Sequence, residues 1–147
     1  MSGSLASLAT FAIASITVAA ASSVNGSGTI TFGSSVEHIS VNATAGATPT
    51  ASSGRVTFED KAAGGNVNGQ ISVNCVTIVG NTATVSGTVT HSNKKSLIGS
   101  EGVFQVVDNG NRADLASIIN FHQVGVGTNC TSGEFDLAPV KGNFTIQ

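Results

Sequence analysis

The chain has 147 residues, of which 10% are charged, and its formal net charge at pH 7 is -2. This length fits one domain that can bury enough apolar surface to fold alone. The charge argues against nucleic acid as a partner, because no broad basic surface is available to neutralise phosphates. Thr, Val, Ser, Ala and 18 Gly dominate the sequence, so its composition predicts an all-β protein. Trp and Tyr are absent, so a sugar-stacking or base-stacking platform would have to be built from the 7 Phe alone, which argues against a carbohydrate-binding module.

Residues 1–22 have the pattern of a signal peptide. The run from Leu5 to Ala21 is uncharged and rich in Leu, Ala, Ile and Val, and it ends in three small residues that suit a signal peptidase. The first basic residue is Arg55, so the basic start of an ordinary signal is missing. A buried strand or a short membrane anchor is the alternative, but Ser and Thr interrupt the run and it is short for a bilayer. We therefore expect a secreted, extracellular protein with no stable membrane span, whose single β domain covers residues 23–147.

Short strands separated by Gly, Asn and Ser follow the leader. Strands joined by short turns form an antiparallel meander, and about eight of them can close into a barrel or fold as a sandwich. We favour the closed barrel, because pairing of Gly142–Ile146 with Gly28–Phe32 would remove both sheet edges. The predicted strands are Gly28–Phe32, Glu37–Ala43, Gly54–Glu59, Asn68–Val79, Thr82–Ser92, Gly102–Asp108, Ala116–Gln123 and Glu134–Ile146, the last with a break at Pro139.

The clearest hairpin joins the fourth and fifth of these strands through Gly80-Asn81, a pair that tolerates the positive φ of a tight turn. Thr82–Ser92 alternates small or apolar residues with Thr and Ser, which predicts one buried face and one hydroxyl-coated face. In the preceding strand the apolar residues have odd numbers up to Cys75 and even numbers at Val76 and Ile78. This change of parity moves them from one face of the strand to the other. A β-bulge near Cys75 would reconcile the two halves.

Cys75 and Cys130 are the only cysteines, and neither has metal-ligand spacing. A structural disulfide is the simplest interpretation for an exported chain, and two unpaired buried thiols are the alternative. An unstrained bridge of this loop length stabilises the fold by about 4 kcal/mol. The acceptor pattern for N-glycosylation also occurs, although a chain rich in Asn, Ser and Thr generates it by chance. The four candidate acceptors are Asn25, Asn42, Asn129 and Asn143.

The sequence from about Gly28 onward resembles a family of small exported proteins that are common in soil actinobacteria and fungi and have no established activity. The shared features are Gly69-Gln70-Ile71 leading to Cys75, Gly80-Asn81-Thr82-Ala83, Gly87, Gly99, Phe104 to Gly110, Asp114, Ser117, Cys130, Pro139-Val140 and Gly142-Asn143. After Asp-Asn-Gly the family continues with Glu-Gly and a Pro-bearing loop, whereas this chain has the shorter Asn111-Arg112-Ala113. The resemblance implies export, β structure and a bridge between Cys75 and Cys130, and it implies nothing about activity.

One loop gathers oxygen ligands of the kind that calcium uses, namely those of Asp108, Asn109, Asn111 and Asp114. The spacing is not that of a helical calcium loop, and Arg112 would reduce the negative field. A hairpin turn in which Asp and Asn side chains bond to their own backbone is the favoured interpretation. We expect no metal and no cofactor.

No local signature organises catalytic residues. The three histidines, His38, His91 and His122, are too far apart in sequence to form a metal pair, and surface positions are favoured for them. No nucleophile elbow surrounds a Ser. The carboxylate pairs Glu59-Asp60 and Glu134/Asp136 are best explained as solvated surface acids.

Three functional hypotheses follow. The first is a non-enzymatic extracellular domain that binds an unknown small ligand or surface partner, or that has a structural role. The second is a small barrel enzyme of the cyclase or isomerase kind, with His91, His122 and Glu134 in the barrel mouth. The third is self-association through an uncovered edge strand to build a surface assembly.

Overall fold

The computed structural model describes residues 3–4, 6–14, 22–62, 64–122, 130 and 135–147. The described chain is all-β, as the composition predicts, and has ten strands and two short 3-10 turns. Its elements are β1 (Ser23–Phe32), β2 (Ser35–Thr44), η1 (Pro49–Ala51), β3 (Ser53–Ala62), β4 (Gly65–Val79), β5 (Thr82–Ser92), η2 (Lys95–Leu97), β6 (Glu101–Val107), β7 (Leu115–Ala116), β8 (Asn120–His122), β9 (Ala138–Pro139) and β10 (Lys141–Ile146).

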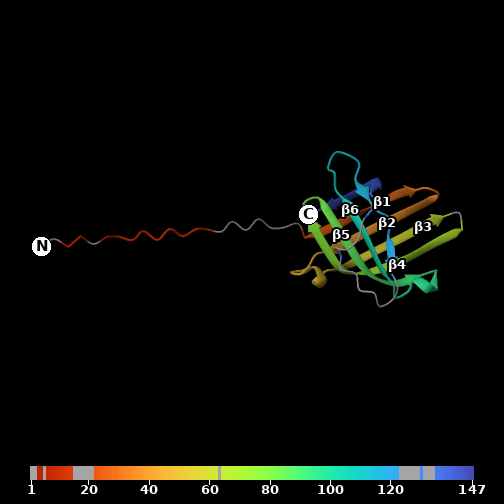
Figure 1. Cartoon of the computed structure of the whole chain (residues 1–147), viewed down its shortest axis with the longest axis horizontal. Helices are drawn as coiled ribbons and strands as arrows, with labels where there is room; N and C mark the ends of the chain where they lie inside the picture. Colours follow the sequence, from red (N-terminus) through yellow and green to blue (C-terminus); the bar gives the residue numbers. More distant parts are fainter. Residues whose placement is uncertain (1–2, 5, 15–21, 63, 123–129, 131–134) are drawn as a thin grey trace.

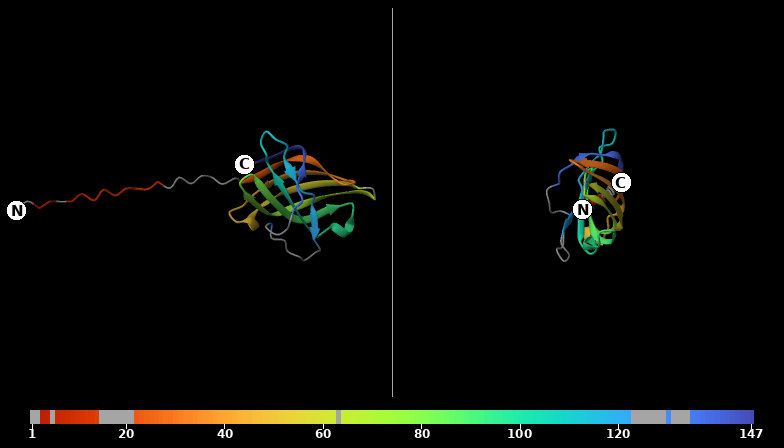
Figure 2. Two further views of the ribbon diagram at one scale, coloured as in Figure 1. Left: turned by 45° about the horizontal axis from the view of Figure 1, so that its top comes forward. Right: turned by 90° about the vertical axis from the view of Figure 1, so that its right-hand side faces the viewer.

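Strands β1 to β6 form an antiparallel meander that curls into a nearly closed barrel (Figures 1 and 2). The order is β10-β1-β2-β3-β4-β5-β6-β7-β9, with β8 also on β6. Only Val140 separates β9 at one end of this order from β10 at the other, so the chain itself joins the two ends of the sheet. The barrel prediction is confirmed, and one seam between these ends has no continuous ladder.

The expected pairing of the last strand with the first is confirmed, but its register differs from the prediction. Lys141–Ile146 lies opposite Val24–Thr29, whereas Ile30–Phe32 pairs with β2 alone. The difference arises because β1 begins at Ser23 rather than at Gly28. Along Ile30–Phe32, the edge of β1 that faces away from β2 therefore has no partner strand among the described residues.

The predicted strand Ala116–Gln123 is interrupted. Its two parts are β7 and β8, which pair with opposite ends of β6. The break follows from Ser117, whose hydroxyl accepts the Gln105 N–H at 3.0 Å in place of a main-chain carbonyl. The last predicted strand is also divided, into β9 and β10 around Val140.

The β4–β5 hairpin and its bulge are confirmed. Val79 pairs with Thr82 across a two-residue turn, in which Gly80 has a φ of 61°. The register shifts between Val73 and Cys75, which is the irregularity that the change of parity predicts. A second shift near Thr90 bends the other end of the hairpin.

Apolar side chains from β1 to β6 and from β10 fill the interior of the barrel. A fully buried Val, Ile or Phe stabilises the fold by roughly 1.5–3 kcal/mol, so this cluster dominates the stability of the domain. The interior is a packed core rather than a ligand chamber. The buried cluster comprises Val24, Ile30, Ile39, Val41, Ala43, Val56, Phe58, Ile71, Val73, Val76, Ala83, Val85, Val89, Phe104, Val106, Ala116, Ile119, Val140 and Phe144.

The outer face of β5 is not the exposed hydroxyl surface that alternation predicts. Ser86 is 1% exposed, and it lies in register between Cys75 of β4 and Val103 of β6. Both neighbours are buried as well, and so is Cys130, which is bonded to Cys75. A second, smaller buried cluster therefore lies outside the barrel wall. The prediction of a solvated hydroxyl face is wrong at Ser86 and also at Thr84, which is 7% exposed.

The described part of residues 1–22 has no regular secondary structure. Its apolar side chains are exposed, with Leu8, Phe11 and Ile13 at 93%, 87% and 90%. Among the described residues, no helix has the length and apolar character needed to cross a membrane.

Candidate functional site

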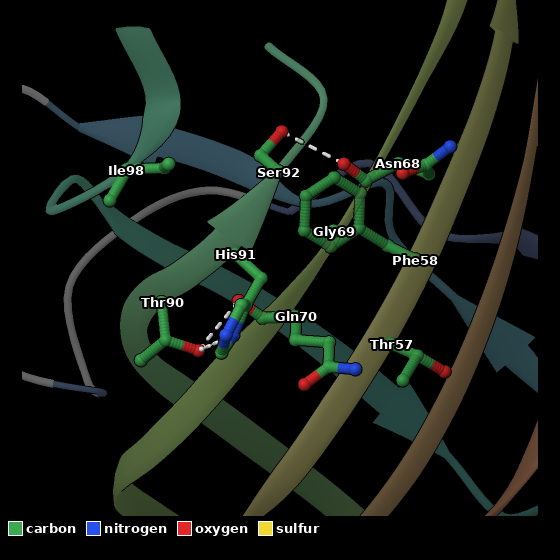
Figure 3. A pocket seen from close by; sticks show the side chains of 9 residues that line it. All are labelled: Thr57, Phe58, Asn68, Gly69, Gln70, Thr90, His91, Ser92 and Ile98. Carbon is green, nitrogen blue, oxygen red and sulfur yellow. Dashed lines mark hydrogen bonds between the residues drawn. The ribbon is translucent and has the colours of Figure 1, made fainter. Parts of the chain in front are cut away.

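A hollow of about 490 Å³ opens on neighbouring strands β3, β4 and β5 (Figure 3), and we call it the groove. Most of its lining side chains are polar, and its exposed apolar surface comes mainly from Ile98, because Phe58 is buried. The lining residues are Thr57, Phe58, Asn68, Gly69, Gln70, Thr90, His91, Ser92 and Ile98.

Strand register assembles the polar part of the groove. Thr57 of β3 lies opposite Gln70 of β4, which lies opposite His91 of β5. Because adjacent strands are roughly 4.8 Å apart, this row spans about 10 Å. The irregular register at Thr90 orients the imidazole, and His91 Nδ1 lies 3.1 Å from the Thr90 hydroxyl.

The floor of the groove depends on Gly69, which has no side chain. A Cβ at this position would lie 2.4 Å from the His91 carbonyl oxygen and 2.8 Å from the Phe58 ring, so only glycine allows β5 and the ring to approach. Phe58 is buried and packs against Phe121 of β8, with ring centroids 5.3 Å apart. The groove floor is thus connected to the opposite wall of the barrel.

A second hollow of about 280 Å³ lies on β1, β2 and β3 and has a different chemistry. Lys61 Nζ is 3.1 Å from Glu59 Oε1, so the two opposite charges are already paired. His38 Nδ1 lies 3.1 Å from the Thr29 hydroxyl, with both side chains exposed. These polar groups satisfy one another, which leaves this hollow the weaker candidate.

One buried acid was missed by sequence reasoning. Glu37 is 3% exposed, and its Oε1 accepts the Ile119 N–H at 2.9 Å. Burial raises the pKa of Glu37 to about 7; the hydrogen bond from Ile119 lowers it, and the charge of Asp60 raises it further. The signal was present, because Glu37 shares the parity of the buried residues Ile39 and Val41.

The loop that holds Asp108, Asn109, Asn111 and Asp114 uses its carboxylates to bind backbone N–H groups. Each Asp accepts one N–H from within the loop and one from β10, while Asn111 is exposed. Asn109 Nδ2 donates to the Ala113 carbonyl at 3.0 Å. The contacts are Asp108 Oδ1 with Gly110 N at 3.0 Å, Asp108 Oδ2 with Ile146 N at 3.1 Å, Asp114 Oδ1 with Asn109 N at 2.9 Å, and Asp114 Oδ2 with Phe144 N at 2.7 Å. In the part of the chain that the structure describes, no three His, Cys, Asp or Glu side chains form a metal-binding group.

The residues proposed for a barrel-mouth enzyme do not share a hollow in the described structure. His91 is exposed and lines the groove, whereas His122 is exposed on β8 opposite Glu101 and is not part of that lining. Glu134 lies outside the described residues.

The bridge between Cys75 and Cys130 is confirmed, with the two Cα atoms 5.8 Å apart. Cys130 Sγ also lies 2.8 Å from the Thr77 hydroxyl. Of the candidate glycosylation sites, Asn42 and Asn143 are exposed and Asn25 is half-buried, and Asn129 lies outside the described residues.

The groove is the best-assembled candidate for binding. Its amide, hydroxyl and imidazole groups both donate and accept hydrogen bonds, and the described residues of its lining include no carboxylate, Lys or Arg. Such a surface suits an uncharged polar ligand rather than an ion. Comparisons of the chain with family models, with curated proteins and with solved structures found no match.

Proposed function

We propose that this chain is an exported, non-enzymatic barrel that binds a neutral saccharide outside the cell, in the groove on β3, β4 and β5. The observation that carries the proposal is the row of Thr57, Gln70 and His91, which presents uncharged hydrogen-bonding groups on three strands beside Phe58. Binding sites for small ligands combine apolar surface with a few well-placed polar groups of this kind.

Export is supported by the signal-like residues 1–22, by the resemblance to a family of exported proteins, and by the disulfide. Disulfides persist in oxidising compartments and are rare in the cytosol. The buried bridge between Cys75 and Cys130 suits a protein that must persist outside the cell.

A neutral saccharide is favoured by the chemistry of the lining. Its hydroxyl groups match the mixed donors and acceptors of Gln70 and His91, and its apolar ring face can contact Ile98, which is 45% exposed. The part of the lining that the structure describes holds no carboxylate, Lys or Arg, so it offers a charged sugar no counter-charge to offset its desolvation.

The other two hypotheses have less support. A barrel-mouth enzyme needs an open interior, and apolar side chains occupy that space. Edge-to-edge assembly needs a free edge strand, and the pairing of β1 with β10 over Val24–Thr29 leaves only the short edge at Ile30–Phe32 of β1 open among the described residues. A protein that elutes from size-exclusion chromatography as a concentration-dependent polymer would revive the assembly hypothesis.

The experiment is an NMR titration of ¹⁵N-labelled protein with glucose, mannose and N-acetylglucosamine and their short oligomers, with glucuronate as the charged comparison. We expect chemical-shift changes at Gln70 and His91. Gln70→Ala or His91→Ala should weaken binding by about tenfold, the loss of one hydrogen bond. Thr31→Ala, on the exposed outer face of β1, is the matched control and should leave affinity unchanged. Shift changes that are absent, or that persist unchanged in both groove variants, would reject the proposal.

A further inference from the structure

One end of the barrel is closed by side chains instead of a strand ladder. At this end Ile30–Phe32 pairs with β2 alone, and β8 pairs with β6 alone among the described residues. The contact that crosses the interior is the hydrogen bond from Ile119 N to Glu37 Oε1, which joins β2 to the segment between β7 and β8. Glu37 is therefore positioned to hold that segment against the barrel.

A second carboxyl lies beside Glu37 without a donor of its own. Asp60 of β3 is the register partner of Glu37 on β2, and directly opposite side chains on one face of a sheet are in contact range. Asp60 Oδ1 is buried and has no hydrogen-bond partner in the described structure. A proton on Glu37 would supply the missing donor, through an O–H that points to Asp60 Oδ1.

Among the described residues, the strands and the segment packed against the two acids offer them no cation. From β1, Ile30 lies opposite Glu37, and from β4, Val67 lies opposite Asp60. The segment after β7 contributes Ile119 and then Phe121, both apolar.

The titratable residues next to the two acids along their strands lie on the other face of the sheet. His38 follows Glu37 on β2, and Glu59 and Lys61 flank Asp60 on β3; all three line the second hollow. His122 of β8 is exposed and lies opposite Glu101 of β6, whose Oε2 accepts a hydrogen bond from Thr88. Within the described residues, Glu37 therefore faces one other titratable group, Asp60.

We propose that the Glu37 carboxyl is a pH-sensitive latch, which as the neutral acid bridges Ile119 and Asp60 and which, on losing its proton to solvent, loosens this end of the barrel. Two carboxylates opposite each other in an apolar interior repel and lack hydration, so opening becomes easier because it admits water. The raised pKa of Glu37, about 7 against an ordinary 4.5, agrees with this geometry.

The segment that Glu37 holds is linked to the groove by the packing of two phenylalanine rings. Phe121 lies two residues after Ile119, in β8, and contacts Phe58, which lines the groove. Loosening of the segment after β7 therefore removes support from the groove floor. The proposal itself does not require the groove to bind a ligand, so the two can fail separately.

Amide hydrogen exchange of the full chain, measured by NMR and corrected for intrinsic base catalysis, tests the latch. Between pH 5 and 7 the protection factors of the Ile119 and Phe121 amides should fall by about tenfold per pH unit and then level off, as linkage to one proton requires. Glu37→Gln keeps an acceptor for Ile119 and a donor for Asp60 without titrating, and it should abolish this dependence. Glu59→Gln, on the adjacent outer position, should leave it intact.

Two further measurements decide the outcome if Glu37→Gln fails to fold. The ¹³C carboxyl signal of Glu37 in the unmodified protein should titrate with a midpoint near 7, and Asp60→Asn should move that midpoint to lower pH. A midpoint near 4.5, or protection factors independent of pH between 5 and 7, would overturn the proposal.

Discussion

The Asp114 carboxylate accepts the Phe144 N–H at 2.7 Å and thereby joins the segment before β7 to the last strand across the barrel seam. The Val140 N–H donates to the Asp114 carbonyl at 2.9 Å, so the main chain of the same residue also holds the link between β9 and β10. Asp108 makes the parallel contact to Ile146. Where a continuous ladder is missing, carboxylates take the place of backbone carbonyls as acceptors.

Asp114→Ala should destabilise the domain by about 3 kcal/mol or more, because it removes two hydrogen bonds to a buried charged group and leaves two N–H groups unpaired. Asp114→Asn keeps one acceptor oxygen and should lose less. Chemical denaturation measures both. Asp136→Ala at an exposed position is the control, and its free energy of unfolding should stay within about 0.5 kcal/mol. Equal stabilities for Asp114→Ala and the control would contradict the role of Asp114 at the seam.

Replacing both cysteines, as Cys75→Ser with Cys130→Ser, should lower stability by about 4 kcal/mol under oxidising conditions, because the bridge closes a loop with a sequence separation of 55. The melting temperature should fall accordingly. The reduced native protein is the matched comparison and should melt close to the double variant. A thiol assay that finds two free thiols in the oxidised protein would contradict the bridge.

Ser86→Ala should stabilise the domain by about 1 kcal/mol, because the Ser86 hydroxyl is buried and has no hydrogen-bond partner among the described residues. The change keeps Cβ and removes the unpaired oxygen. Ser72→Ala, at an exposed position of the neighbouring strand β4, should have little effect in the same denaturation measurement. Destabilisation by Ser86→Ala would reveal a polar contact for the hydroxyl.

The free energy of unfolding should depend on pH through Glu37. The pKa of Glu37 is about 7 in the folded chain, against an ordinary value of 4.5. Between pH 4.5 and 7 the folded chain therefore keeps a proton on Glu37 that the unfolded chain releases. The Glu37 contribution is therefore fully present below pH 4.5 and declines by about 3 kcal/mol as the pH rises to 7. Urea denaturation at several pH values measures the slope. In Glu37→Gln the Glu37 part of this slope should vanish, and an unchanged slope would assign the dependence to other groups.

Local patterns in the sequence predict much of the fold. Alternation of apolar residues predicts the long strands, Gly80-Asn81 predicts the β4–β5 turn, and the change of parity at Cys75 predicts the bulge. These features were accessible because turn geometry and the two-residue repeat of a strand depend on neighbours in the chain. The paired cysteines were accessible because the chain contains only two.

Contacts between distant strands could not be predicted in the same way. Parity places Glu37 inside the barrel, but only the register of β2 against β3 sets it opposite Asp60. The groove likewise needs three strands in register, and the burial of Ser86 needs Cys130 to lie over the outer face of the sheet. Alternation along one strand determines which face a side chain takes. Which side chains then meet depends on how the sheet closes, and this closure is a property of the whole barrel.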